Sequence, residues 1–341
     1  MNDRTLVLHA GPHKTGSTYL QHRLNKARGA LAGQFWSYPD YAIANNSHYG
    51  VYSWLTGTST SDTVNEESFR AMVAKQTQFI LSCEDFIYLS KEKLLKLKSY
   101  LDGFNVQVIL YIRSPVDLWP SHWQELVRHG RDLTLLEYVS AHAGWTSALE
   151  SAIMDPLVQA NKFTDVFGHD SLRMFCYENI MDAGGDLFEH FWTDILRLSA
   201  PAPFEAPRTI NPSQPADKIE MLRCLNELYA DKHDDRPGTK ILSAYQKRQS
   251  EIEALPRYAS FKQELTTRST IVKLNSGQEF FRVRENRFFA KFGSRVENPA
   301  APNKLFARPQ FERKIPYMAR YWICKFGYLD FVREIFGRLE I

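Results

Sequence analysis

The chain has 341 residues, and its 44% hydrophobic content is enough to bury a full core. We find no apolar run long enough to span a membrane, and we expect no signal peptide. Its 42 Lys and Arg and 39 Asp and Glu give a net charge of +3, too small to indicate a nucleic-acid partner. The four cysteines form no Cys-x-x-Cys pair and no zinc-ligand cluster, so we expect a reduced, cytoplasmic protein without a structural metal.

The first predicted elements are a strand, a turn and a helix. The apolar run from Thr5 to Leu8 predicts a buried strand, and apolar residues at 20, 24, 27 and 31 predict a helix. The turn between them carries Gly11 and Gly16, which let a ligand approach the backbone, together with Lys14 and three hydroxyls. Because this arrangement points N–H groups at an anion, we expect a phosphate or sulfate there. An ordinary strand-to-helix turn is the alternative.

The turn differs from the common nucleoside-triphosphate loop. That loop places its lysine directly after the second glycine and follows it with Ser or Thr. In this chain Lys14 comes two residues before Gly16. The sequence therefore predicts an anion-binding turn of another kind.

Residues 36–70 are rich in Tyr, Asn, Ser, Thr and Gly, which is typical of a partly irregular insertion. We expect this insertion to form a lid on the acceptor side of a site. It contains His48. That histidine either hydrogen-bonds the acceptor or is an ordinary exposed loop residue.

A second strand is predicted at 79–83, and it is followed by Glu84 and Asp85. A carboxylate at the carboxyl end of a strand can reach a ligand and accept its proton, so Glu84 is a candidate general base. The alternative is that Glu84 stabilises the helix that starts near Phe86. Asp85 suits the N-cap of that helix better.

A third strand is predicted at 106–112, and it ends at Arg113. The guanidinium fork suits a phosphate monoester, although a surface salt bridge is the alternative role for Arg113. Ser121 follows eight residues later. Because Pro120 would lose a hydrogen bond inside a helix, we expect an irregular turn before Ser121 and a regular helix after it.

A fourth strand is predicted at 171–177, and helices are predicted at 216–232 and 240–254. Strands that alternate with helical stretches indicate an α/β fold, with a parallel sheet flanked by helices on both faces. Residues 199–215 contain five prolines and are predicted to be a connector.

The end of the chain is basic and aromatic. Residues 281–341 carry 13 Lys or Arg against 6 Asp or Glu. The apolar spacing in 310–341 predicts two amphipathic helices hinged at Gly327. They either complete the core, form a homodimer or dock on a membrane surface, which would place the protein at the inner membrane face.

The turn Gly11-Pro-His-Lys-Thr-Gly-Ser-Thr18, the strand end Ser82-Cys-Glu84 and the pair Arg113 and Ser121 together resemble sulfotransferases that use 3′-phosphoadenosine 5′-phosphosulfate (PAPS), in particular the bacterial, carbohydrate- or glycolipid-type branch. The resemblance implies that Arg113 and Ser121 bind the 3′-phosphate. It implies that Glu84, or a histidine such as His48, is the base. It assigns the 5′-phosphosulfate to the loop residues Gly11, His13, Lys14, Thr15, Gly16, Ser17, Thr18 and Tyr19. For His13, solvent is the alternative contact.

The resemblance implies a P-loop-like sulfotransferase domain over 1–293, with a helical insertion at 199–280 and a C-terminal extension at 294–341. It implies sulfation of a hydroxyl on a carbohydrate, glycolipid or other small acceptor, with Lys14 stabilising the departing phosphate and no metal required. Two other functions compete with this one. A small-molecule kinase would need a Gly-Lys-Ser/Thr sequence, which the loop lacks. A non-catalytic module that binds a nucleotide or sulfated glycan would not need Glu84.

Overall fold

The computed structural model describes residues 4–142, 155–199, 215–233, 235–267, 269–274, 279–298, 311–316 and 327–340. The chain divides into two compact units, and both are discontinuous in sequence. The first comprises 1–115, 147–210 and 277–308. The second comprises 116–146, 211–276 and 309–341. This division differs from the expected domain over 1–293, because three separated segments of the chain pack together as a unit of their own.

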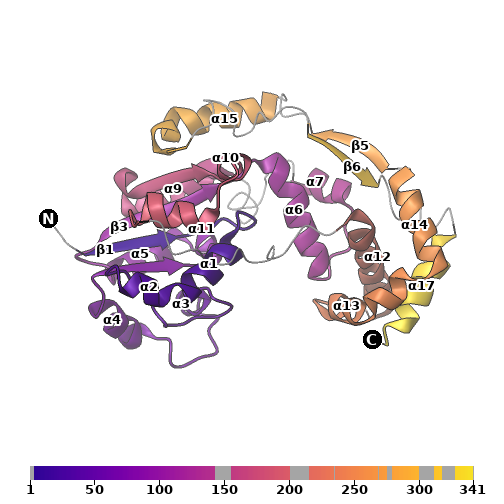
Figure 1. Ribbon diagram of the computed structural model, residues 1–341, viewed down its shortest axis with the longest axis horizontal. Coiled ribbons are helices and arrows are strands. Elements are labelled where there is room, and N and C mark those ends of the chain that lie inside the picture. The colour runs from indigo at the N-terminus through magenta and orange to yellow at the C-terminus, as the bar shows by residue number, and fades with distance from the viewer. Residues whose placement is uncertain are drawn as a thin grey trace. The chain divides into compact units, whose positions relative to one another are not determined.

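The first unit contains a four-stranded parallel sheet in the order β2-β1-β3-β4 (Figure 1). The predicted α/β fold with a parallel sheet flanked by helices is confirmed, and each strand lies where the sequence predicts it. Because the strands are parallel, all their carboxyl ends lie along one edge of the sheet. The strands are β1 (Thr5–His9), β2 (Gln78–Ser82), β3 (Asn105–Ile112) and β4 (Leu172–Cys176).

Helices cover both faces of this sheet. On one face, apolar side chains of α1, α2 and α11 form a single buried cluster with inward-facing strand residues such as Val7, Ile80 and Ile109. On the other face, α9 contacts β3 and β4, and α5 packs against α9. The helices of this unit are α1 (Ser17–Lys26), α2 (Arg28–Ala32), α3 (Tyr49–Thr56), α4 (Glu66–Ala74), α5 (Lys91–Ser99), α9 (Pro156–Phe167), α10 (Tyr177–Asp182), α11 (Leu187–His190) and α15 (Glu279–Phe292).

The segment expected to be an insertion begins inside the core. Trp36 and Tyr38 are buried in the cluster beneath the sheet. Ser37 lies beside β2, where its N–H donates to the Gln78 carbonyl and its carbonyl accepts from the Ile80 N–H, both at 2.9 Å. The start of this segment therefore covers part of an edge strand, which would otherwise expose unpaired backbone groups.

The second unit is mostly helical, and its central helix is α12 (Ala216–His233), which has buried residues on all its sides from Ile219 to Asn226. The helices predicted at 216–232 and 240–254 are confirmed. The other elements are α6 (Pro115–Arg128, of which all but Pro115 lies in this unit), α7 (Leu135–His142), α13 (Lys240–Glu253), α14 (Pro256–Thr267), α17 (Tyr328–Arg338) and an antiparallel pair, β5 (Ser269–Leu274) with β6 (Phe311–Pro316).

Two sequence predictions fail in this unit. Residues 311–316 form β6, so the prediction of a helix there is wrong; residues 317–326 lie outside the described part, and Gly327 precedes α17 in a left-handed conformation with φ 72°. The irregular turn expected at Pro120 is also wrong, because α6 runs through it. The apolar face of α6 is buried at Leu118, Trp123 and Val127, and this burial offsets the hydrogen bond that Pro120 cannot make.

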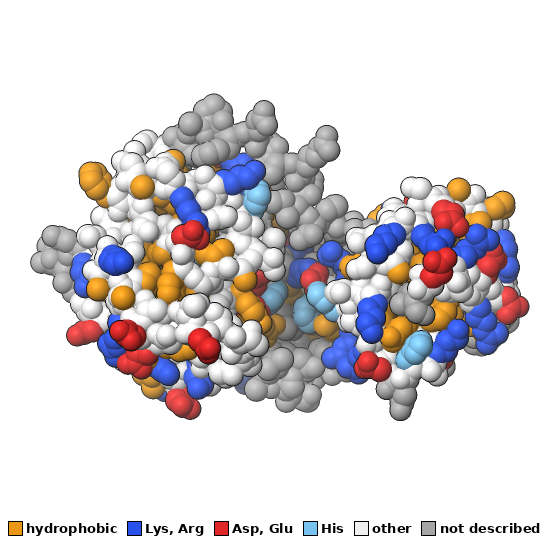
Figure 2. Space-filling view, turned by 90° about the horizontal axis from the view of Figure 1, so that it is seen from below, with side chains coloured by type: hydrophobic (Ala, Val, Ile, Leu, Met, Phe, Trp, Pro, Cys, Tyr) orange, Lys and Arg blue, Asp and Glu red, His pale blue; other side chains and the backbone are white. Residues whose placement is uncertain are grey.

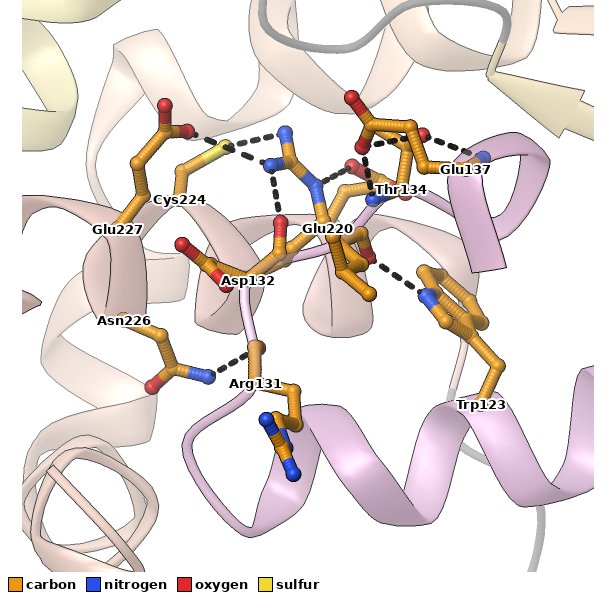
Figure 3. Close-up of polar contacts among 11 residues, drawn as sticks. Trp123, Arg131, Asp132, Thr134, Glu137, Glu220, Cys224, Asn226 and Glu227 are labelled. Atoms are coloured by element: carbon orange, nitrogen blue, oxygen red, sulfur yellow. Dashed lines mark hydrogen bonds and ion pairs between the residues drawn. The ribbon is translucent and has the colours of Figure 1, made fainter. Parts of the chain in front are cut away.

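Buried polar side chains of α12 hold the loop between α6 and α7 (Figure 3). Asn226 donates to the carbonyls of Val127 and Arg131 at 2.7 and 2.9 Å. Arg223 is only 1% exposed; it donates to the Asp132 carbonyl at 3.0 Å and pairs with Glu220 at 2.9 Å. These bonds satisfy carbonyls at and beyond the end of α6 that the helix itself leaves unpaired.

The surface reflects the nearly balanced composition. Figure 2 shows basic and acidic side chains interspersed over the visible face of the described residues. Within that described part, no helix combines the length and the apolar character needed to cross a bilayer.

Candidate functional site

The predicted strand, turn and helix at the start of the chain are confirmed. The turn between β1 and α1 has three residues in the left-handed region: Gly11 (φ 83°), Lys14 (φ 66°) and Gly16 (φ 78°). α1 starts at Ser17, with no side chain capping it and no acidic residue in its first turn. The positive end of this helix dipole is therefore not neutralised by a capping carboxylate.

The sequence predicts that all three hydroxyls of the turn, those of Thr15, Ser17 and Thr18, face an anion, but two of them bond within the turn. Thr15 is fully buried, and its Oγ1 donates to the Pro12 carbonyl at 2.7 Å. The Ser17 hydroxyl donates to the same carbonyl at 3.2 Å. Thr18 is the exposed hydroxyl of the three. Thr15 and Ser17 thus fix the shape of the turn.

The turn packs directly against the end of β2. A Cβ atom at Gly11 would lie 3.0 Å from Glu84 Cα and 3.1 Å from its Cβ, a tight approach at a backbone conformation that already favours glycine. The geometry thus brings Glu84 beside the turn, as the shared edge of the sheet predicts.

A residue that sequence reasoning missed holds Glu84 in place. Gln21, on α1 and only 1% exposed, donates from Nε2 to Glu84 Oε2 at 2.6 Å. The sequence does hold a signal for this role of Gln21, because Gln21 directly follows Leu20 and falls on the helix face that carries the apolar residues. A buried amide usually has a specific partner, since burying it without one is costly.

The capping role expected for Asp85 is wrong. The short 3₁₀ helix η1 (Glu84–Tyr88) has Cys83 at its N-cap position, and no side chain caps it. Asp85 Oδ1 instead lies 3.1 Å from His13 Nε2. Both side chains are partly exposed, at 22% and 28%. The His13 and Asp85 pair and the Gln21 and Glu84 pair therefore link the loop and α1 to the end of β2.

Arg113 lies at the carboxyl end of β3 and braces the turn from the other side. Its Nη1 donates to the Lys14 carbonyl at 2.7 Å, and its Nε donates to Glu178 Oε1 at 3.0 Å. Glu178 comes from the first turn of α10, which follows β4. The salt-bridge alternative for Arg113 is therefore part of its role. Ser121 lies on α6, which belongs to the second unit.

His48 is fully buried, so the exposed-loop alternative is wrong. Its Nδ1 accepts from the Ser82 N–H at 3.1 Å, and its Nε2 lies 3.2 Å from the Pro39 carbonyl. Burial lowers the pKa of His48 to about 4. Because both ring nitrogens are engaged by the backbone, we do not retain His48 as the base.

His9, at the end of β1, is a second buried histidine that sequence reasoning missed. Its Nδ1 lies 2.7 Å from Ser82 Oγ, while its Nε2 has no hydrogen-bond partner in the described part of the chain. Burial lowers its pKa to about 3, which keeps the ring neutral. His9 is therefore a neutral, buried side chain, whose ring packs edge-to-face against Tyr111 and Phe191.

The cysteines of the described residues, Cys83, Cys176 and Cys224, are buried free thiols. Burial raises the pKa of Cys176 to about 12, so it is protonated at neutral pH. Among the described residues, no group of three or more His, Cys, Asp and Glu side chains is placed to hold a metal ion.

Comparison of the chain with protein-family models, with curated proteins and with solved structures gave no match.

Proposed function

We propose that the protein is a PAPS-dependent sulfotransferase that transfers a sulfuryl group to a hydroxyl of a carbohydrate, glycolipid or other small acceptor. The observation that carries the proposal is the juxtaposition of a glycine-bracketed βα turn, an uncapped start of α1 and a carboxylate, Glu84, at one edge of a parallel sheet. The choice of PAPS as the donor rests on the sequence resemblance of the turn and of Arg113 to PAPS-dependent sulfotransferases.

The donor's 5′-phosphosulfate suits the turn. The helix dipole and the Lys14 ammonium supply positive charge, and Thr18 offers an exposed hydroxyl. Arg113 binds the 3′-phosphate in this proposal, and Ser121 is assigned to it by the resemblance. Arg113 also donates to the Lys14 carbonyl. In this proposal it therefore binds the donor directly and also positions the turn that holds the donor's phosphosulfate.

In the transfer, the acceptor oxygen forms a bond to sulfur while the bond from sulfur to the bridging oxygen breaks. The electron pair of that bond leaves with the phosphate of adenosine 3′,5′-bisphosphate. Lys14 stabilises this developing charge. The acceptor proton passes to Glu84, whose second oxygen is held by Gln21.

The test incubates the full chain with ³⁵S-labelled PAPS and a panel of hydroxylated acceptors, and measures release of adenosine 3′,5′-bisphosphate and labelling of the acceptor. We expect transfer by the wild type and by Lys26→Ala, which removes an exposed lysine at the far end of α1, and a large loss in Lys14→Ala. Phosphoryl transfer from ATP instead would overturn the proposal in favour of a kinase. Binding of PAPS with no transfer to any acceptor would favour the non-catalytic module.

A further inference from the structure

α3 is fastened to the end of β2 by the buried His48. The His48 N–H donates to the Ser82 carbonyl at 2.8 Å, and the Ser82 N–H donates to His48 Nδ1 at 3.1 Å. Because α3 begins at the next residue, Tyr49, this pair of bonds places the start of α3 beside the strand end that carries Glu84. α3 also packs against η1, which contains Asp85 and Tyr88.

Three tyrosine rings lie on α3 and η1. The rings of Tyr49 and Tyr52 lie 5.6 Å apart on α3, and the ring of Tyr88 lies 5.4 Å from that of His13. Tyr49 is 42% exposed, and the other two tyrosines are partly exposed. The rings therefore leave apolar surface open to solvent on α3 and η1, and Tyr88 brings this surface to the loop.

Polar groups lie among these rings. Asp85 and His13 form a partly exposed pair. Burial and then the Asp85 charge raise the pKa of both Tyr52 and Tyr88, which agrees with phenols that lie near this carboxylate. Aromatic surface beside a few hydrogen-bonding groups is the usual lining of a small-molecule site.

We propose that Tyr49, Tyr52 and Tyr88, with the His13 and Asp85 pair, form a binding subsite for a pyranose ring. A pyranose presents a C–H face that packs on an aromatic ring, and hydroxyls that donate to a carboxylate such as Asp85. A simple phenol would match the rings, but it has a single hydroxyl, whereas a pyranose offers several hydroxyls to the two polar side chains of the His13 and Asp85 pair. The mixture of rings and polar groups favours the polyhydroxylated ring.

The subsite adjoins the candidate base, because Asp85 directly follows Glu84 in η1. The identity of the bound sugar as the sulfuryl acceptor rests on the proposed function. Binding of a sugar at this place is independent of that function, because only the rings and the His13 and Asp85 pair are needed for it.

The experiment measures binding of cellobiose and of 4-methylphenol to the full chain by saturation-transfer NMR and by titration, with adenosine 3′,5′-bisphosphate binding measured in parallel by calorimetry. We compare the wild type with Tyr49→Ala, Tyr52→Ala and a matched control, Phe35→Ala. Phe35 is 85% exposed and lies two residues before Ser37, which pairs with the opposite, amino-terminal end of β2. The Tyr49 variant should fold, because its side chain is 42% exposed and lies outside the buried core.

We expect cellobiose to bind the wild type and Phe35→Ala equally, and its dissociation constant to rise about three- to tenfold in each tyrosine variant. Equal binding to all four proteins would overturn the location. Binding of 4-methylphenol without cellobiose would overturn the ligand class, and binding of neither probe would overturn the subsite. Cellobiose binding that depends on the tyrosines, without any bisphosphate binding, would leave the subsite standing and remove the PAPS donor.

Discussion

Lys14 carries both a charge and an unusual backbone conformation. Its φ of 66° costs a non-glycine residue about 1–2 kcal/mol. The bond from Arg113 to the Lys14 carbonyl, together with the Thr15 and Ser17 bonds to Pro12, holds the turn in this shape. Strain of this kind persists where neighbours fix it, and such places are often functional.

Lys14→Ala tests the charge at this position. The side chain matters most as the bridging bond breaks, so we expect kcat to fall by about 10²–10³ while PAPS affinity changes much less. Steady-state kinetics with calorimetry separates the two quantities. A loss confined to affinity, with kcat unchanged, would contradict the role.

Glu84→Gln tests the base. The amide keeps the size of the side chain but cannot take the acceptor proton, so turnover should fall by about 10²–10⁴ with PAPS binding unchanged. Asp85→Asn is the matched control; since Asp85 caps no helix, it should raise KM for the acceptor rather than lower stability. Near-normal turnover in the Glu84 variant would remove the assignment.

Arg113→Ala tests the two roles of this arginine. Loss of its bond to the Lys14 carbonyl should weaken binding of adenosine 5′-phosphosulfate, which has no 3′-phosphate. Loss of a charge-assisted bond to that phosphate should weaken PAPS by at least about a further tenfold. Calorimetry with both ligands measures the difference. Equal losses would leave Arg113 as a brace of the turn only.

At the scale of elements, His48 determines where α3 starts and makes that attachment sensitive to acid. Its pKa is lowered by burial to about 4, against 6.5 in the unfolded chain. Between these values the unfolded chain takes up a proton and the folded chain does not. The free energy of unfolding should therefore fall as the pH drops from 6.5 toward 4, by on the order of 3 kcal/mol from this residue.

Urea unfolding of the wild type and of His48→Asn at pH 7 and pH 4.5 checks this expectation. Asn keeps an acceptor for the Ser82 N–H but does not titrate, so the variant should lose less stability on acidification. His129→Asn, whose parent side chain is 58% exposed, should behave as the wild type does. An unchanged pH dependence in His48→Asn would show that the attachment is not acid-sensitive.

The strands and the turn could be predicted because local patterns determine them. Buried parallel strands read as apolar runs, and Gly11 and Gly16 mark a turn whatever surrounds it. Gln21 and His48 could not be assigned, since their roles depend on partners 63 and 34 residues away. Asp85 was misassigned because an acid near a helix start can cap it or, as here, meet a side chain from another loop.

At the scale of the whole molecule, the linear order of the chain conceals the second unit. β5 and β6 pair across a gap of more than thirty residues, and α17 packs on α12 although about a hundred residues separate them. Amphipathic spacing in 310–341 showed that a face is buried, but not against what. For β6, pairing with β5 overrode the helical spacing.

The role of α17 distinguishes the alternatives for the end of the chain. Its apolar residues Phe331, Val332 and Ile335 are at most 1% exposed, and Arg338 pairs with Glu334 and with Glu251 of α13. The apolar face of α17 is thus used inside the second unit, as the core-packing alternative predicts. Membrane docking or dimerisation would have to use other residues.

Phe331→Ala tests this role of α17. Removing a fully buried ring should lower the free energy of unfolding by about 3–5 kcal/mol, because it leaves a cavity as well as losing apolar burial. Arg333→Ala, an exposed position on the same helix, should change it by less than about 0.5 kcal/mol. Urea unfolding measures both variants, with liposome sedimentation and analytical ultracentrifugation alongside. If α17 served a membrane or a second copy of the chain, Phe331→Ala would leave the unfolding free energy intact and weaken liposome binding or self-association instead.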